Sequence, residues 1–398
     1  MVKVKIERYN NQLEGIGYIG GKIIFIPKTK VGDIVDVNII DEKSSYYRGE
    51  VSVINSKIDC PYFYECGGCS LRNFSYEDTL KLKQNSFESL LKGKNISVDN
   101  VNIHPNVNHY NYRNKISLKI VNGKVGYYKE KTNTIVEIDN CLIAKDAINE
   151  FLKEIPNFKI KNGDITIRCN YNDELLIIIK TDDDIKYDFK SLKEEHKIAG
   201  VIVNNKTVLN DNFFIDKINE KLFKISYDSF FQVNNYGAEL IVNIIKSKLS
   251  SSDKVLDLYC GVGALGLSVS DNIDSLIGIE IVPNAIENAL FNSRMNRVEN
   301  ANFILGDVSK SLDKIKSSFN TVIFDPPRAG LDSKTKDFVL ESKPKKIIYV
   351  SCNPITLVRD LSDFINDYKI CSVDLVDMFS YSYHVESVCV LERKWFND

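Results

Sequence analysis

Residues 345–354 read KKIIYVSCNP, and this stretch decides the fold of the C-terminal part of the chain. The apolar run 347–350 is typical of a strand that is buried on both faces of a parallel sheet. Ser351 and Cys352 then lie at its carboxyl end, the edge at which open α/β sheets bind ligands. The turn Asn353-Pro354 fixes the direction of the thiol, which suits a nucleophile. The same pattern also fits a buried cysteine that only fills space, so the surrounding sequence must distinguish the two readings.

A nucleotide-binding pattern precedes this strand in DKVLDLYCGVGALGLSVS, residues 253–270. A predicted strand leads into Gly261 and Gly263, Ala264 follows, and a helix comes next. Glu280 ends the following strand, nineteen residues after Gly261. Such glycines let the backbone approach a ligand at a helix N-terminus, and the strand-end acid can accept hydrogen bonds from ribose hydroxyls. We therefore predict a Rossmann-like domain with a nucleoside-containing cofactor.

Two cofactors compete for this pattern, NAD and S-adenosylmethionine. NAD places its pyrophosphate against the glycine turn, whereas S-adenosylmethionine has no phosphate and needs a carboxylate near its positive end. Asp257, before the turn, and Asp307, where a third strand ends, fit S-adenosylmethionine better. Either acid also fits a capping role.

A second strand end carries the sequence NTVIFDPPRAG, residues 320–330. The strand delivers Asp325 into a turn that two prolines lock, which holds its side chain in one place. Asp325 also fits the role of a simple turn residue. Placed after a nucleotide-type βαβ unit, D-P-P resembles the target-base motif of S-adenosylmethionine-dependent methyltransferases.

Three cysteines lie close together in DCPYFYECGGCS, residues 59–70, with the spacing C-x5-C-x2-C. Interleaved glycines let the backbone wrap a metal, and the best fourth ligand is Cys141. Four thiolates suit either zinc or a [4Fe–4S] cluster, and the spacing does not choose between them. Reduced structural thiols are the alternative. The first gap is longer than in radical enzymes, which favours a structural or RNA-positioning cluster. The proposed ligands are Cys60, Cys66, Cys69 and Cys141.

Residues 1–57 alternate short β-rich runs with glycine turns, which predicts a small antiparallel β-barrel. Its lysines and arginines could form a basic face, but acids nearly balance them, so an ordinary solvated surface fits as well. Through GKIIFIPKTKVGDIVDV, residues 21–37, the stretch resembles the TRAM domain, an RNA-binding barrel. The basic residues are Lys3, Lys5, Arg8, Lys22, Lys28, Lys30 and Arg48.

The composition and the remaining pattern complete the domain plan. A chain of 398 residues with 43% hydrophobic residues predicts two or three domains, and the net charge of −2 requires any RNA to meet a local basic patch. Without a leader pattern or a long apolar run, we expect a cytoplasmic protein with no membrane segment and no obligatory protein partner. A capped amphipathic helix over 75–92 should link domains. The predicted domains are the barrel (1–57), an α+β domain with the metal cluster (58–230) and the α/β Rossmann-like domain (231–398).

Across nearly its whole length the chain resembles the RNA uracil-C5 methyltransferase family, through the TRAM-like barrel, the cysteine spacing, DLYCGVG, DPPRAG, SCNP and HVESVCVLER. The resemblance implies that Cys352 is the nucleophile and Glu386 the general base, with Asp325 and Arg328 at the base. It implies a [4Fe–4S] cluster on the four cysteines. The cofactor residues that we expect are Gln232, Tyr259, Gly261, Gly263, Ala264, Glu280, Asp307 and Asp325.

Family members with both TRAM and the cysteines resemble 23S rRNA uracil-5 methyltransferases, which makes 23S rRNA the expected partner. A tRNA uridine methyltransferase, a non-catalytic RNA-binding assembly factor and an NAD-dependent oxidoreductase are the alternatives. Two positions depart from the family pattern. Ser380-Tyr381-Ser382 replaces the usual Pro-Gln-Thr, and Ala264 replaces a polar residue.

Overall fold

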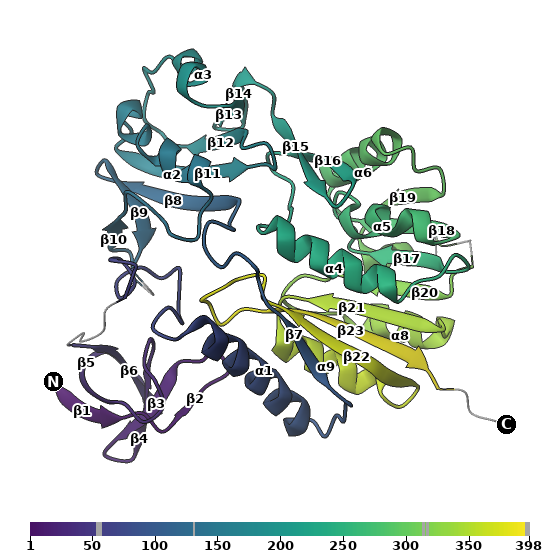
Figure 1. Cartoon of the computed structure of the whole chain (residues 1–398), viewed down its shortest axis with the longest axis horizontal. Helices are drawn as coiled ribbons and strands as arrows, with labels where there is room; N and C mark the ends of the chain where they lie inside the picture. The colour runs from purple at the N-terminus through teal and green to yellow at the C-terminus, as the bar shows by residue number, and fades with distance from the viewer. Residues whose placement is uncertain (53–57, 130–131, 313–314, 316–317, 395–398) are drawn as a thin grey trace.

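The computed structural model describes residues 1–52, 58–129, 132–312, 315 and 318–394. Over these ranges the strands form a six-stranded, a seven-stranded and an eight-stranded sheet and one separate hairpin (Figure 1). The predicted end of the first domain at residue 57 lies outside the described residues. No helix in these ranges is both long enough and apolar enough to cross a bilayer.

The N-terminal sheet curls on itself, so that β1 packs against β3. A Cβ atom on Gly17 would lie 2.3 Å from Val4 Cγ1, which leaves room only for glycine. The prediction of a wholly antiparallel barrel is wrong at one pairing, because β4 runs parallel to β6. The reason is that the chain crosses over after β4, so that β5 pairs with β1. Strand β6 then runs back along β5 and lies beside β4 in the same direction. In the order β1-β5-β6-β4-β3-β2, the strands are β1 Val2–Lys5, β5 Ile34–Glu42, β6 Tyr46–Val51, β4 Lys22–Ile26, β3 Gly15–Ile19 and β2 Arg8–Tyr9.

The central sheet has helices on one face, an α+β arrangement. Ile148 and Phe151 of α2 (Asp146–Leu152) pack on Ile165 and Ile177 of the sheet, while α3 (Leu192–Glu195) adds Leu192 to the same core. The order is β10-β9-β8-β11-β12-β13-β14. These strands are β10 Ile135–Glu137, β9 Lys124–Tyr128, β8 Lys115–Val121, β11 Asn162–Cys169, β12 Leu175–Lys180, β13 Ile198–Val203 and β14 Lys206–Asn210.

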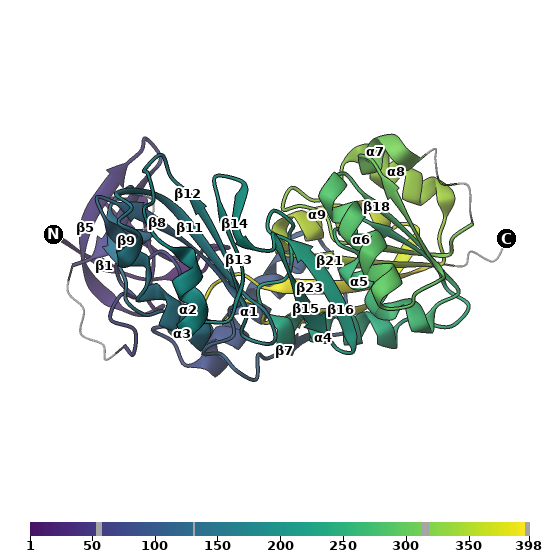
Figure 2. The ribbon, with the colours of Figure 1, turned by 90° about the horizontal axis from the view of Figure 1, so that it is seen from above.

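The C-terminal sheet is covered by helices on both faces, and all four apolar residues of 347–350 are fully buried in it (Figure 2). Strand β21 lies parallel to β20 but antiparallel to β23, so the expected parallel neighbours occur on one side only. The strands, in the order β19-β18-β17-β20-β21-β23-β22-β7, are β19 Ala301–Leu305, β18 Ser275–Glu280, β17 Lys254–Leu258, β20 Thr321–Phe324, β21 Lys346–Ser351, β23 Glu386–Arg393, β22 Tyr368–Val376 and β7 Val101–His104.

Two separate apolar cores lie between this sheet and its helices. The helices on one face are α4 Asn235–Ser247, α5 Ala264–Val269 and α6 Pro283–Met295. The helices on the other face are α1 Tyr76–Gly93, α7 Val308–Ser311, α8 Ser333–Ser342 and α9 Pro354–Phe364.

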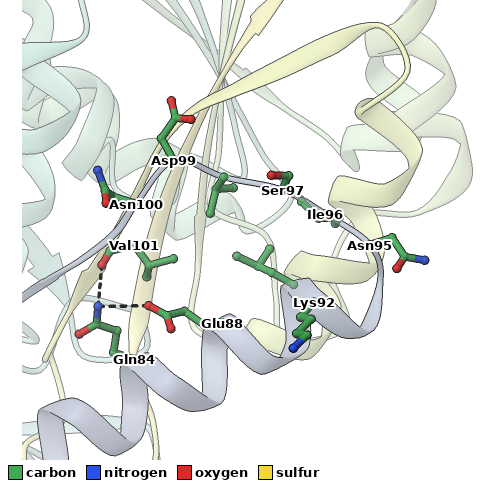
Figure 3. A pocket seen from close by; sticks show the side chains of 11 residues that line it. Gln84, Glu88, Lys92, Asn95, Ile96, Ser97, Asp99, Asn100 and Val101 are labelled. Atoms are coloured by element: carbon green, nitrogen blue, oxygen red, sulfur yellow. Dashed lines mark hydrogen bonds between the residues drawn. The ribbon is translucent and has the colours of Figure 1, made fainter.

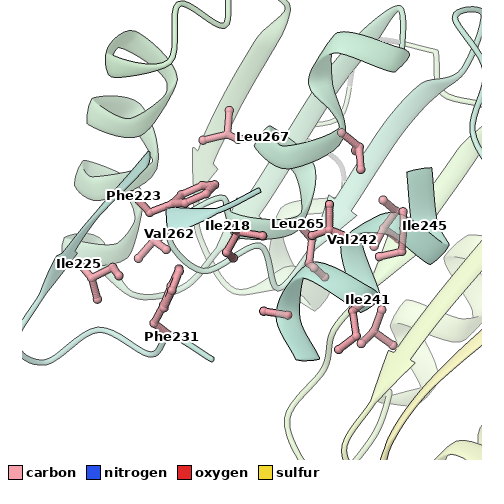
Figure 4. Packing of buried hydrophobic residues seen from close by; sticks show 14 of the residues in the cluster. Ile218, Phe223, Ile225, Phe231, Ile241, Val242, Ile245, Val262, Leu265 and Leu267 are labelled. Atoms are coloured by element: carbon pink, nitrogen blue, oxygen red, sulfur yellow. The ribbon is translucent and has the colours of Figure 1, made fainter. Parts of the chain in front are cut away.

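Besides α1, two segments that precede residue 230 pack in the layers of the C-terminal sheet. Strand β7 pairs with β22 at the edge of the sheet. The hairpin of β15 (Phe213–Ile218) and β16 (Lys221–Ser226) buries its apolar side against α4 and α5 (Figure 4). The packing therefore does not follow the predicted division at that residue, because the alternating apolar side chains of the hairpin need the helices as cover.

Helix α1 begins where the sequence predicts. Ser75 caps it by accepting a hydrogen bond from the backbone N–H of Asp78 at 3.1 Å. Its buried side chains are spaced every four residues, as an amphipathic helix requires, but they include a lysine, Lys83, alongside Phe87 and Leu91. The helix packs on α9 and connects the N-terminal sheet with the C-terminal one.

Candidate active site

Cys352 and Glu386 lie side by side at the edge of the C-terminal sheet. Ser351 at the end of β21 pairs with Ser387 on β23, so the next position on each strand brings the thiol and the carboxyl together. Glu386 is buried and Cys352 is partly buried. Asn353 caps α9 by accepting a hydrogen bond from Ile355 N–H at 3.2 Å, which places the thiol at the positive end of the helix.

The DPPRAG turn is held against the start of α9. The carbonyl of Arg328 accepts hydrogen bonds from Asn353 Nδ2 at 2.9 Å and Thr356 Oγ1 at 3.2 Å. Gly330 has a φ of 78°, and a Cβ atom there would lie 2.5 Å from Asp360 Oδ2. The glycine is therefore required for the turn to fit, and the turn in turn fixes Arg328 beside Cys352.

The charged groups around Cys352 shift the pKa of its thiol in opposite directions. Burial raises the pKa of the Cys352 thiol, Glu386 raises it further, and Arg328 acts in the opposite direction. Burial raises the pKa of Glu386 well above its usual value, with a further contribution from Asp325. Burial also raises the pKa of Asp325 to about 7. The thiol of Cys352 and the carboxyl of Glu386 thus share one arginine beside a second buried carboxyl, a combination typical of sites that transfer protons.

A pocket of about 220 Å³ opens beside Cys352. It is built by three parts of the chain that are distant in sequence: the turn after β2, helix α1, and the ends of the C-terminal strands. The residues that line it are Asn11, Gln12, Lys83, Ser86, Phe87, Leu90, Arg328, Cys352, Asn353, Pro354, Ile355, Tyr383, His384 and Val385.

A second cavity lies at the glycine turn and brings together five of the expected cofactor residues. Asp257, buried at the end of β17, also lines it and accepts a hydrogen bond from Gly266 N–H at 3.1 Å through Oδ2. Its Oδ1 is buried and has no partner among the described residues. Burial, and then Asp325, raises the pKa of Asp257 to about 8. The expected residues in this cavity are Gln232, Tyr259, Gly261, Ala264 and Asp325.

The other three expected cofactor residues lie near this cavity but do not line it. Glu280 accepts a hydrogen bond from Gly261 N–H at 3.1 Å and closes the turn after β18. Gly263, with a φ of 81°, caps α5. Asp307 caps α7 and accepts a hydrogen bond from Ser309 Oγ at 2.7 Å. The cavity is also lined by Phe230 and Phe231, two aromatics that are not among the expected cofactor residues.

The four cysteines Cys60, Cys66, Cys69 and Cys141 line one cavity of about 300 Å³. Among the described residues, no three of their sulfur atoms lie within 4.8 Å of one another. Burial raises the pKa of Cys69 to about 12, with a smaller contribution from Cys141.

A buried arginine faces the cysteine cavity. The side chain of Arg72 is 1% exposed and donates two hydrogen bonds to Asp59, at 2.7 and 2.9 Å. It stacks between the rings of Tyr110 and Tyr381. Its Nη1 is buried without a partner among the described residues. A free guanidinium donor beside four thiols fits a group of negative charge, as thiolate-bound clusters are.

The cysteine cavity and the Cys352 pocket share a wall, because Arg328 and His384 line both. Burial and the neighbouring Arg328 lower the pKa of His384 to about 4, so its ring is neutral at physiological pH. His384 is not among the site residues that the sequence predicts. Its position two residues before Glu386 was the available indication of a role in the site.

The segment 380–382, which departs from the family pattern, joins the two sites. The carbonyl of Tyr381 accepts hydrogen bonds from the backbone N–H groups of Ser70 and Leu71, at 3.0 and 2.9 Å. The cysteine segment is therefore fixed to the loop that leads to Glu386.

A buried ion pair, which no local sequence pattern indicates, lies behind this loop. Lys83 and Asp377 are both fully buried and in contact. Asp377 also accepts hydrogen bonds from Tyr76 Oη at 2.6 Å and Ser380 Oγ at 2.7 Å. The pair holds helix α1 against the loop. Lys83 therefore lines the Cys352 pocket although it lies on a buried face of the helix.

A groove of about 600 Å³ lies elsewhere, between α1 and residues 95–101 (Figure 3). Gln84 bridges it by donating to Glu88 Oε1 and to the carbonyl of Val101. None of the expected site residues is among those that line it.

Comparison with known proteins agrees with this arrangement. Residues 75–394 match the tRNA (uracil-5-)-methyltransferase family and residues 1–52 match the TRAM domain. An uncharacterized RNA methyltransferase of Caldanaerobacter subterraneus is 33% identical over 99% of both chains, and one of Aquifex aeolicus is 30% identical over 99% of both. The crystal structure of Pyrococcus abyssi tRNA (uracil-54, C5)-methyltransferase in complex with S-adenosyl-L-homocysteine superposes with a TM-score of 0.79 and 25% identity, covering 98% of this chain and 100% of that one. The chain therefore belongs to the RNA uracil-C5 methyltransferase family and carries an N-terminal TRAM domain.

Proposed function

We propose that this protein transfers a methyl group from S-adenosylmethionine to C5 of a uridine in RNA. The observation that carries the proposal is the position of Cys352, beside Glu386 and Arg328 in a pocket next to the cofactor cavity. A catalytically inert assembly factor would not require this arrangement of a thiol, a buried base and a cation.

S-adenosylmethionine fits the second cavity better than NAD does. The buried, unpartnered Oδ1 of Asp257 calls for a hydrogen-bond donor, which the amino and hydroxyl groups of S-adenosylmethionine supply. The described cavity presents carboxyls, Asp257 and Asp325, where NAD would bring a pyrophosphate. When bound, S-adenosylmethionine supplies an electrophilic methyl group. Family membership, and the S-adenosyl-L-homocysteine bound to the Pyrococcus abyssi protein, support the same choice.

The residues of the pocket divide the chemistry into steps. C5 of uracil is a poor nucleophile, so the Cys352 thiolate adds to C6 and pushes an electron pair towards O4. The resulting enolate is stabilised by positive charge, which Arg328 supplies. After C5 has taken the methyl group, the Glu386 carboxylate removes the C5 proton, and the electron pair left behind expels the sulfur from C6.

Asp325 connects the two ligands. It lines the cofactor cavity, and its charge acts on both Cys352 and Glu386. With a pKa of about 7, it is partly protonated near neutral pH and can donate a hydrogen bond to a base oxygen. We assign it to contacts with the target base as well as with the cofactor.

We further propose that the four cysteines hold a [4Fe–4S] cluster. All four line one cavity, which suits a group bound by four thiolates, and the family resemblance favours [4Fe–4S] over zinc. The cluster would supply a rigid anchor for residues 60–69, and Arg72 would donate to it from the cavity wall. Joined to the catalytic loop through Tyr381, this anchor would position RNA rather than take part in methyl transfer.

For the substrate we propose 23S rRNA, on the combination of a TRAM domain with the four cysteines. A tRNA uridine is the second candidate, because the Pyrococcus abyssi protein with a matching fold over the whole chain is a tRNA (uracil-54, C5)-methyltransferase.

The test is methyl transfer from labelled S-adenosylmethionine to 23S rRNA and tRNA transcripts, followed by identification of the labelled nucleoside. Label in 23S rRNA as 5-methyluridine would support the whole proposal. Label in tRNA would keep the reaction and replace the substrate. Bound cofactor without any transfer, to transcripts or to total RNA, would favour the assembly-factor alternative.

A further inference from the structure

The turn between β2 and β3 is a rigid element at the edge of the Cys352 pocket. Asn10 Oδ1 accepts hydrogen bonds from the backbone N–H groups of Gln12 and Glu14, both at 2.9 Å. Glu14 is held in turn by Arg48 Nη1 at 2.8 Å. With its backbone fixed in this way, the turn presents the exposed side chains of Asn11 and Gln12 outwards.

The N-terminal sheet that carries this turn is fixed to the rest of the protein. Lys28 is buried and donates hydrogen bonds to the carbonyls of Phe63 and Cys66, at 2.7 and 2.9 Å. Its own carbonyl accepts a hydrogen bond from Asn73 Nδ2 at 3.0 Å. The sheet is therefore docked on the cysteine segment, and the turn has a defined place relative to Cys352.

Asn11 and Gln12 are part of the wall of the pocket that contains Cys352. Two cations of the same sheet are paired with acids, Lys3 with Asp36 and Lys22 with Glu42. Resting on the uracil-C5 methyl transfer proposed above, we propose that Asn11 and Gln12 form a subsite for the base next to the target uridine. They thereby set a sequence preference at that position.

The chemistry of the two side chains supports a reading role. A carboxamide offers a donor and an acceptor together, and so it bonds the edge of an unpaired base in a pattern that differs between bases. A well-placed amide pair discriminates against the wrong base by about tenfold or more. Charged side chains would mainly add affinity for phosphate without sequence preference.

The experiment uses the full-length protein and RNA transcripts that contain 5-fluorouridine, which has no C5 proton to lose and therefore traps the adduct with Cys352. Adducts formed on 23S rRNA and tRNA transcripts first locate the target uridine. The bases on either side of it are then varied one at a time, and the rates of adduct formation are compared. The variants are Gln12→Ala and Asn11→Ala, with Asn38→Ala, an exposed amide of the same sheet outside the pocket, as the matched control.

We expect the wild type and Asn38→Ala to prefer one base beside the target by about tenfold, and Gln12→Ala or Asn11→Ala to reduce this preference to about twofold. An unchanged preference in both pocket variants, or a wild type without any preference, would overturn the subsite. Absence of an adduct with the wild type on every transcript would instead contradict the proposed uracil-C5 chemistry, so the two failures are distinguishable.

Discussion

Two groups of partly buried thiols lie on opposite sides of the wall formed by Arg328 and His384. On one side, Cys352 is a single thiol beside two carboxyls, at the N-terminus of a helix. On the other side, four thiols surround a cavity into which a buried arginine, Arg72, presents a free donor. Burial raises the pKa of thiols on both sides, so neither exposure nor the direction of the pKa shift separates them.

The neighbours of each thiol separate them instead. A carboxyl next to Cys352 can take a proton from a bound substrate, which suits a thiol that attacks and leaves. A cation next to several thiols stabilises bound thiolates, which suits a ligand that stays in place. The comparison predicts different losses when a cysteine is removed on either side of the wall.

Removing Cys352 should have the largest effect. We expect Cys352→Ala to lower methyl transfer by at least about 10³-fold, because Cys352 is the one thiol among the residues that line the pocket. Binding of S-adenosylmethionine, measured by calorimetry, should stay close to wild type, because Cys352 does not line the cofactor cavity. The control is Cys371→Ala, an exposed cysteine on β22. Turnover retained in Cys352→Ala would remove it as the nucleophile.

Replacing Glu386 tests the partner that distinguishes the catalytic side. In Glu386→Gln the thiol can still add to the base, but the C5 proton has no acceptor, and turnover should fall by about 10²- to 10⁴-fold. A covalent RNA–protein adduct should then persist in denaturing gels. Glu392→Gln, at an exposed position of the same strand, is the control and should leave no adduct. Inactive protein with only free RNA would contradict the assigned base.

Replacing a cysteine on the other side should change the metal and not the chemistry. We expect Cys66→Ser to lose iron and sulfide together with the brown colour of the protein, measured against Cys371→Ser. Methyl transfer should fall less than in Cys352→Ala, because the cluster acts only on position. A colourless wild type that contains zinc would correct the cluster assignment.

Local patterns in the sequence indicated where the candidate residues of the catalytic side lie in the fold, because most of them follow strand ends; their roles stay predictions. The run 347–350 and the turns after β17 and β20 follow from local patterns, and parallel packing brings the carboxyl ends of these strands to the edge where the antiparallel strand β23 begins. The spacing of three cysteines similarly placed them in one cavity with Cys141.

Local sequence patterns do not predict contacts between segments that are distant in the chain. Lys83 occupies a position that a helical pattern assigns to an apolar residue, and only the acid at Asp377 makes its burial tolerable. Nothing in the local pattern of Asn11 and Gln12 shows that a turn of the first sheet reaches the Cys352 pocket. Likewise, the spacing of His384 from other residues in the sequence does not indicate that its side chain lines both cavities.

The Lys83–Asp377 pair allows both sides of the wall to be disturbed at once. Lys83→Met leaves a buried carboxylate without its cation, and we expect the free energy of unfolding to fall by about 3–5 kcal/mol. Urea titration measures this loss. The double variant Lys83→Met/Asp377→Asn should recover part of the stability, because the unpaired charge is gone. Equal stability of Lys83→Met and wild type would show that the pair does not hold α1 to the loop.

Removing the charge of Arg328 from the shared wall should have the smallest effect. The result shows whether Arg328 acts on Cys352 or on the four cysteines. Arg328 opposes the burial and the Glu386 charge that raise the pKa of Cys352, so Arg328→Met should raise that pKa further. Only the thiolate reacts with iodoacetamide, so alkylation of Cys352 should slow severalfold at neutral pH and its midpoint should move to higher pH. Peptide mass spectrometry assigns the modified cysteine, and Arg294→Met, at an exposed position on α6, is the control. If the iron content and colour stay as in wild type while Cys352 responds, Arg328 acts mainly on the catalytic thiol. A change in colour with unaltered alkylation would assign Arg328 to the cluster instead. The charge of Arg328 would then act on the four cysteines and not on Cys352.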